Sequence, residues 1–135
     1  MAKKQLIATI DSTPTGMAGT VGMISANCYR AGNMVFMTGQ TGFTLEGKLV
    51  GVGDVAAQTH QACQNIDALM RMAGGTIKDV VKTITYVTDR KYRDVVYPIM
   101  RSYYDIHPCS TGIVVNGLAI PELLMEIDAW GWIDD

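Results

Sequence analysis

The chain has 135 residues and a net charge of −2, with 48% hydrophobic and 18% charged residues. This length suits one domain, so we expect a single domain over residues 1–135. The slightly acidic balance supplies no basic surface for phosphate backbones, which excludes nucleic acid as the expected partner.

The first part of the chain predicts strands and a hairpin. Residues 5–10 alternate loosely and end at turn-forming residues 11–14, which is typical of a strand, and the Gly- and Thr-rich stretch 15–22 predicts a loop. A second strand around residues 28–30 and a third over 34–38 flank Gly32 and Asn33, residue types that tolerate positive φ. We therefore expect a β-hairpin. Five glycines between positions 39 and 53 then favour irregular backbone.

A helical period of apolar residues follows and predicts a helix over residues 54–73. Asp54 can cap its start, and Gly74 can end it in the left-handed conformation. Thr76 and Asp79 then have the spacing of a capping box, which predicts one short turn.

The second half of the chain predicts three strands and one helix. Residues 80–88 are rich in β-branched side chains and predict a strand. Residues 92–104 predict a helix whose regular part begins near Tyr97, because Pro98 is best tolerated in a first turn. The last two strands are expected at 111–115 and 123–133.

This order of elements predicts an α+β domain with two helices packed on one face of a mixed sheet. The strands carry apolar side chains on both faces, so the face without helices needs another cover. A neighbouring copy of the chain is the expected cover.

Cysteine and histidine usage gives no metal or disulfide pattern. The three cysteines form no Cys-x-x-Cys pair, and there are only two histidines. We expect free thiols in a reducing cytoplasm and no bound metal. The apolar stretch at residues 6–10 is too short for a signal peptide or a membrane span, so neither export nor a membrane anchor is expected.

Several segments together resemble the RidA (YjgF) family. They are Tyr-Arg-Ala-Gly-Asn-Met-Val-Phe-Met-Thr-Gly-Gln at 29–40, Gln-Thr at 58–59, Asn-Ile at 65–66, Ala-Gly-Gly at 73–75, Asp-Val-Val-Lys at 79–82, Val-Thr-Asp at 87–89, Pro108 and Met-Glu-Ile-Asp-Ala at 125–129. The resemblance implies a chorismate-mutase-like fold and a homotrimer with a central barrel and small-molecule clefts between subunits. It also implies hydrolysis of enamines or imines to keto acids and ammonia, without a cofactor.

The resemblance also implies site residues. Tyr29 matches the family's cleft tyrosine, Gly39 matches a glycine whose backbone lines the cleft, and Glu126 matches the acid that positions the attacking water. The signature arginine, which holds a substrate carboxylate, falls at Ser110 in this chain. We therefore expect Ser110 to act with Tyr29 and Glu126, but without arginine-dependent 2-imino acid deamination.

Other positions near the predicted cleft also differ from the family pattern. The family's Gly-Pro before the tyrosine is replaced by Asn27 and Cys28, and its asparagine early in the second helix is replaced by Val96 or Tyr97. The predicted substrate-binding residues are Gly39, Cys109, Thr111 and Arg30.

Each candidate residue has an ordinary alternative. Glu126, or Asp128 beside it, could form a salt bridge or face solvent, and Tyr29 could belong to the core. Cys109 could be a nucleophile, but an inert buried thiol is the favoured interpretation.

The predicted function has alternatives as well. The first is a RidA-like enzyme acting on an enamine, an imine or a related C–N compound. The alternative is a non-catalytic ligand-binding or regulatory trimer of the same fold. Ribonuclease activity is associated with this family by name, and the charge of the chain weighs against it.

Overall fold

In the part of the chain that the structure describes, six strands form one sheet in the order β1-β2-β3-β6-β4-β5. The computed structural model describes residues 3–11 and 24–134, so the predicted loop at 15–22 lies outside the described residues. The strands are β1 (Lys4–Asp11), β2 (Ile24–Ala31), β3 (Met34–Met37), β4 (Val80–Val87), β5 (Cys109–Val114) and β6 (Met125–Trp132). β4 and β5 pair in parallel and the other pairs are antiparallel, which confirms the predicted mixed sheet.

The predicted hairpin joins β2 to β3. Gly32 has a φ of 60° in its turn, a conformation that glycine adopts without steric cost. The irregular segment over residues 39–53 is tied to the following helix by two buried amides. Gln58 donates from Nε2 to the Gly51 carbonyl at 3.0 Å, and Asn65 donates from Nδ2 to the Phe43 carbonyl at 2.6 Å.

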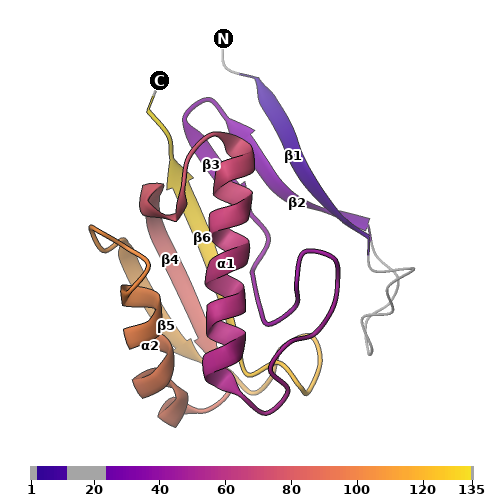
Figure 1. Ribbon diagram of the computed structural model, residues 1–135, viewed down its shortest axis with the longest axis vertical. Coiled ribbons are helices and arrows are strands. Elements are labelled where there is room, and N and C mark those ends of the chain that lie inside the picture. Colours follow the sequence, from indigo (N-terminus) through magenta and orange to yellow (C-terminus); the bar gives the residue numbers. More distant parts are fainter. Residues whose placement is uncertain (1–2, 12–23, 135) are drawn as a thin grey trace.

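Helix α1 (Val55–Ala73) runs along the middle of the sheet (Figure 1). The Asp54 carboxylate accepts a hydrogen bond from the Ala57 amide at 3.0 Å, and Gly74 ends the helix with a φ of 105°. Both predicted caps are therefore confirmed.

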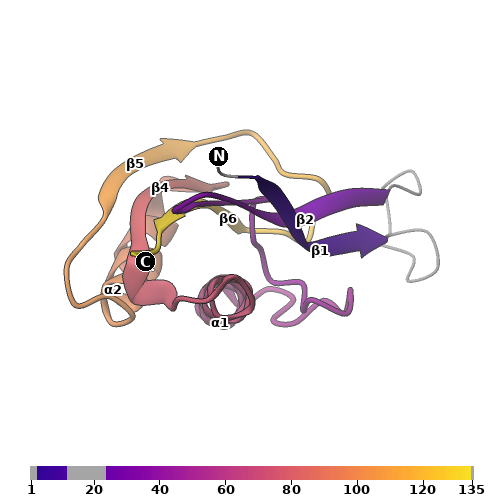
Figure 2. The ribbon, with the colours of Figure 1, turned by 90° about the horizontal axis from the view of Figure 1, so that it is seen from above.

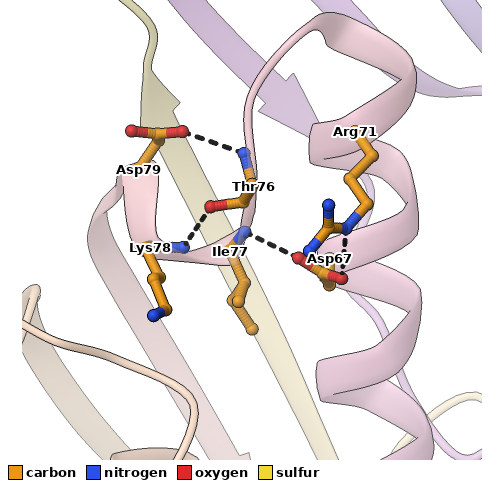
Figure 3. A network of polar contacts seen from close by, with 6 residues as sticks. All are labelled: Asp67, Arg71, Thr76, Ile77, Lys78 and Asp79. Carbon is orange, nitrogen blue, oxygen red and sulfur yellow. Dashed lines mark hydrogen bonds and ion pairs between the residues drawn. The ribbon is translucent and has the colours of Figure 1, made fainter.

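A short 3₁₀ turn (Ile77–Asp79) links α1 to β4 and has the predicted capping box. The Thr76 amide donates to the Asp79 carboxylate at 2.8 Å, and the Lys78 amide donates to the Thr76 hydroxyl at 3.2 Å (Figure 3). The Ile77 amide donates to Asp67 of α1 at 2.9 Å. This turn is thereby fixed to the helix before β4 begins.

Helix α2 (Arg93–Arg101) lies within the predicted range 92–104, but its regular part begins earlier than predicted. A 3₁₀ turn (Arg90–Tyr92) leads directly into it, so the expected start near Tyr97 is wrong. Pro98 lies inside the helix and removes one backbone hydrogen bond. Burial of Val96 and Met100 in the core offsets that loss, because tertiary packing rather than propensity stabilises short helices.

Strand β5 begins two residues earlier than predicted. Cys109 and Ser110 already pair in parallel with Lys82 and Thr83 of β4, directly after Pro108. Side chains alternate along a strand, so Cys109 and Ser110 point to opposite faces of the sheet.

The two faces of the sheet differ. Both helices lie on the same side, here called the helix face (Figure 2), where side chains of α1 and β6 form the core, among them Ile66, Leu69, Met70, Met125 and Ile127. The opposite side, here called the open face, exposes Leu6, Phe36, Ile113 and Trp132 by 40–49%. Among the described residues, no helix is long and apolar enough to cross a membrane.

Candidate functional site

Two carboxylates lie next to each other along β6 on the open face. Met125, Ile127 and Ala129 are buried in the core, so the alternate residues Glu126 and Asp128 point the other way. Glu126 pairs across the sheet with Tyr86 of β4, and the Tyr86 hydroxyl donates to Asp128 Oδ2 at 3.3 Å. The three side chains form one group, here called the carboxylate cluster.

Gly39 lies against this cluster. An isolated bridge between Gln40 and Ile127 brings the segment after β3 back onto β6. A methyl group at Gly39 would be 2.5 Å from Glu126 Oε2 and 2.9 Å from Asp128 Oδ1, so only glycine leaves room for both carboxylates. The structure therefore brings together the two predicted residues Gly39 and Glu126.

Burial changes the acidity of the cluster. Burial and the neighbouring Asp128 charge both raise the pKa of Glu126. Burial also raises the pKa of Asp128, while the hydrogen bond from Tyr86 opposes that shift. The pKa of Glu126 is thus shifted toward neutral pH, the direction that general acid–base catalysis by a carboxyl group favours.

Two other predicted residues, on β5, share the open face with the cluster. Cys109 is exposed in the single chain, so the interpretation as a buried thiol is wrong; it lies on an edge strand, where no core covers it. Thr111 accepts a hydrogen bond from Lys82 Nζ at 3.0 Å. Sequence reasoning missed Lys82 as an open-face cation, although its alternation with Tyr86 along β4 could have revealed it.

Tyr29 is also on the open face but far from Glu126. It pairs with Phe36, which in turn pairs with Trp130 of β6. Trp130 is four residues from Glu126, or about 13 Å along a strand. The single chain therefore does not bring Tyr29 to the carboxylate cluster.

Ser110 faces the helix side. It pairs with the buried Thr83 and lines a cavity of about 250 Å³ beside α2, together with Tyr97 and Tyr104. Val96 is fully buried in the core, whereas Tyr97 lines the cavity. Sequence reasoning missed Arg101, which also lines the cavity four residues after Tyr97.

Arg30 lies apart from both places. Its Nε donates to the Gly32 carbonyl at 2.8 Å, and its Nη1 donates to the Ala73 carbonyl at the end of α1, also at 2.8 Å. These contacts hold the hairpin against the helix. The expectation that Arg30 binds substrate gains no support from this position.

Metal ligation has no geometric basis in the described part of the chain. Residues 3–11 and 24–134 contain no group of three or more His, Cys, Asp or Glu side chains placed to hold a metal ion.

A mixed sheet with both helices on one face and a carboxylate cluster on the other defines a small α+β protein of the chorismate-mutase-like class. Residues 20–132 match the family described as Endoribonuclease L-PSP, so the chain belongs to this family, which includes RidA and YjgF proteins.

Relatives of this chain support the assignment. A RutC family protein of Pyrococcus horikoshii is 29% identical over 105 residues, covering 77% of this chain and 82% of that protein. The 3-aminoacrylate deaminase RutC of Acinetobacter baylyi is 29% identical over 98 residues, covering 73% and 78%. The crystal structure of RidA from an Antarctic Psychrobacter is 27% identical with a TM-score of 0.78, covering 96% of this chain and 99% of that one.

Proposed function

We propose that this chain forms a homotrimer that hydrolyses an enamine, an imine or a related C–N compound in a cleft between subunits. The observation that carries the proposal is the carboxylate cluster under Gly39, where burial and a second carboxylate raise the pKa of Glu126. The similarity to a 3-aminoacrylate deaminase supports the reaction class.

The position of Ser110 supports a cleft built from two copies. Glu126 is on the open face of β6, while Ser110 lines the cavity on the helix face of β5. Since the sheet separates them, one ligand touches both only if each comes from a different subunit. The apolar side chains of Leu6, Phe36, Ile113 and Trp132 supply a surface that a neighbour would cover.

The proposed reaction adds water to a C=N bond. Glu126 accepts a proton from the water as its oxygen bonds to the imine carbon. Glu126 then returns the proton to the nitrogen, which gives a carbinolamine. The hydroxyl proton of this intermediate passes through Glu126 to the nitrogen as the C–N bond breaks, so a carbonyl compound and ammonia leave. An enamine enters the same route after a proton moves to its carbon.

A non-catalytic ligand-binding trimer is the second candidate, favoured by Ser110 at the arginine position. A neutral hydroxyl forms a hydrogen bond about half as strong as a charge-assisted one. The missing guanidinium should therefore cost on the order of 2–4 kcal/mol toward carboxylate substrates, or roughly thirty- to a thousand-fold in rate. The expected substrate carries no obligatory carboxylate.

The test compares wild type, Ser110→Arg, and Ser110→Arg combined with Glu126→Ala, with ammonia release as the readout. Wild type should hydrolyse 2-iminobutyrate poorly, Ser110→Arg should gain activity, and the double variant should lose that gain. A folded Ser110→Arg trimer without any gain would favour the binding protein. Cyclic amides, neutral imines and RNA complete the panel, and RNA cleavage would overturn the proposal.

A further inference from the structure

The cavity beside α2 has an unusual distribution of polar groups. Its lining residues come from α2, β4, β5 and the segment between α2 and β5, and its volume is about 250 Å³. Sites for drug-sized ligands occupy roughly 300–1,000 Å³, so a smaller molecule is the expected occupant. Met100 and Pro108 give it apolar walls, and Ser110 contributes a hydroxyl.

Two hydroxyl groups in its walls have no hydrogen-bond partner. Among the described residues, Thr83 Oγ1 and Tyr104 Oη are the buried side-chain nitrogen or oxygen atoms without one, and both residues line this cavity. Thr83 is fully buried. A buried unpaired hydroxyl destabilises a fold, so native proteins retain few of them. Their coincidence in one cavity therefore indicates a role in binding.

Thr85 provides a contrast on the same strand and face. It is as buried as Thr83, but its hydroxyl donates to Met100 Sδ at 3.5 Å, and it does not line the cavity. A buried threonine on this face can therefore find a partner within the chain, and Thr83 does not.

The basic side chains of the cavity lie at its exposed side. Arg101 and His107 line it but are exposed, whereas Thr83 and Met100 are buried. An exposed guanidinium interacts weakly with an anion because water screens it. A carboxylate that entered among neutral hydroxyls would lose its hydration without a paired charge.

We propose that this cavity binds the polar end of a small uncharged molecule, of the amide, lactam or imine class, through the hydroxyls of Thr83 and Tyr104. A hydroxyl both donates and accepts, so the pair suits a ligand with one acceptor and one N–H donor. Burial raises the pKa of Tyr104, which keeps its hydroxyl protonated for that purpose. The inference rests on the proposed function for its ligand class, because Ser110 belongs to both.

Isobutyramide and isobutyrate test the inference, since they share a shape and differ in charge. Each is titrated into the whole wild-type protein at neutral pH, with binding followed by calorimetry and by NMR shifts of the β4 and β5 amides. Isobutyramide should bind at least about ten-fold more tightly, because only the acid must give up the hydration of a charge. Equal affinities, tighter binding of the acid, or no binding of the amide would overturn the inference.

Three variants show whether the hydroxyls are responsible. Thr83→Val and Tyr104→Phe should each weaken isobutyramide binding roughly five- to ten-fold, while the unliganded protein melts at the same or a higher temperature because an unpaired hydroxyl is removed. Thr85→Val is the matched control and should leave the affinity unchanged. Unchanged affinity in both Thr83→Val and Tyr104→Phe, or a loss as large in Thr85→Val, would contradict the assignment.

The reaction and the cavity can fail separately. If isobutyramide binds as expected and no C–N compound is hydrolysed, the cavity assignment stands and the proposed enzyme is wrong. If the enzyme turns over a neutral imine and Thr83→Val and Tyr104→Phe leave KM and kcat unchanged, the enzyme stands and the cavity assignment is wrong.

Discussion

Glu126 is the residue whose chemistry depends most on its surroundings. Its side chain is partly buried, faces Asp128 on the same strand face, and lies under Gly39. Burial and the Asp128 charge raise its pKa, so ionisation costs more free energy in the folded chain than in the unfolded chain. The same environment that prepares Glu126 for proton transfer therefore destabilises the fold at neutral pH.

This cost predicts a pH-dependent effect of Glu126→Gln. The pKa of Glu126 in the folded chain lies above the ordinary value of 4.5. Between these two pKa values the folded state keeps a proton that the unfolded state has lost, so the free energy of unfolding falls as pH rises through this interval. Glu126→Gln should therefore increase the free energy of unfolding at pH 7 and change it little at pH 4. Urea denaturation at both pH values measures this.

Glu122→Gln, which alters an exposed carboxylate, is the matched control for Glu126→Gln. An equal gain at pH 4 and pH 7 would mean that ionisation of Glu126 is not the cause.

At the scale of elements, the junction between α1 and β4 depends on one carboxylate. Asp67 accepts from the Ile77 amide at 2.9 Å and from Arg71 Nε at 2.7 Å (Figure 3). Asp67→Ala should lower the free energy of unfolding by about 1–3 kcal/mol, because the amide of buried Ile77 loses its partner. Arg71→Ala should cost only about 0–1 kcal/mol, because the arginine side chain is 63% exposed. Equal losses in denaturant unfolding would contradict this assignment.

Local patterns in the sequence predict most elements but not their mutual register. The Asp54 and Gly74 caps and the capping box at Thr76 rest on neighbouring residues, and they are confirmed. The start of α2 is wrong because the packing of Val96 and Met100 outweighs the preference of Pro98. The start of β5 depends on pairing with β4, which lies more than twenty residues away in the sequence.

The same limit applies to the candidate site. The resemblance placed Gly39 and Glu126, and their close approach follows from the bridge between Gln40 and Ile127. The contact between Lys82 and Thr111 follows from strand register, and the place of Arg101 in the cavity wall follows from helix packing. A sequence motif encodes neither. The resemblance predicts Ser110 and Thr111 in one cleft, but adjacent residues of a strand point to opposite faces of the sheet.

At the scale of the whole molecule, the open face calls for a neighbour. Leu6, Phe36, Ile113 and Trp132 remain exposed across it, and β5 is an edge strand that pairs with β4 on one side alone among the described residues. We expect sedimentation at micromolar concentration to give a trimer. A monomer would contradict both the oligomer and the cleft between subunits.

The arrangement of the cleft predicts that two chains with little activity toward 2-iminobutyrate become active when they are mixed. One chain carries Ser110→Arg with Glu126→Ala and lacks the carboxylate; the other is wild type and lacks the arginine. In a ring of identical contacts, mixing equal amounts pairs an introduced arginine with an intact Glu126 at about a quarter of the interfaces. After denaturation and joint refolding, 2-iminobutyrate hydrolysis should therefore reach about a quarter of the Ser110→Arg rate. Refolding each chain alone is the control, and it should give only the low rates of the separate proteins. A mixture that did no better than the average of the two proteins, although mixed trimers had formed, would contradict a cleft that takes residue 110 from one subunit and Glu126 from the next. The two residues of one subunit cannot replace it, because the sheet separates them.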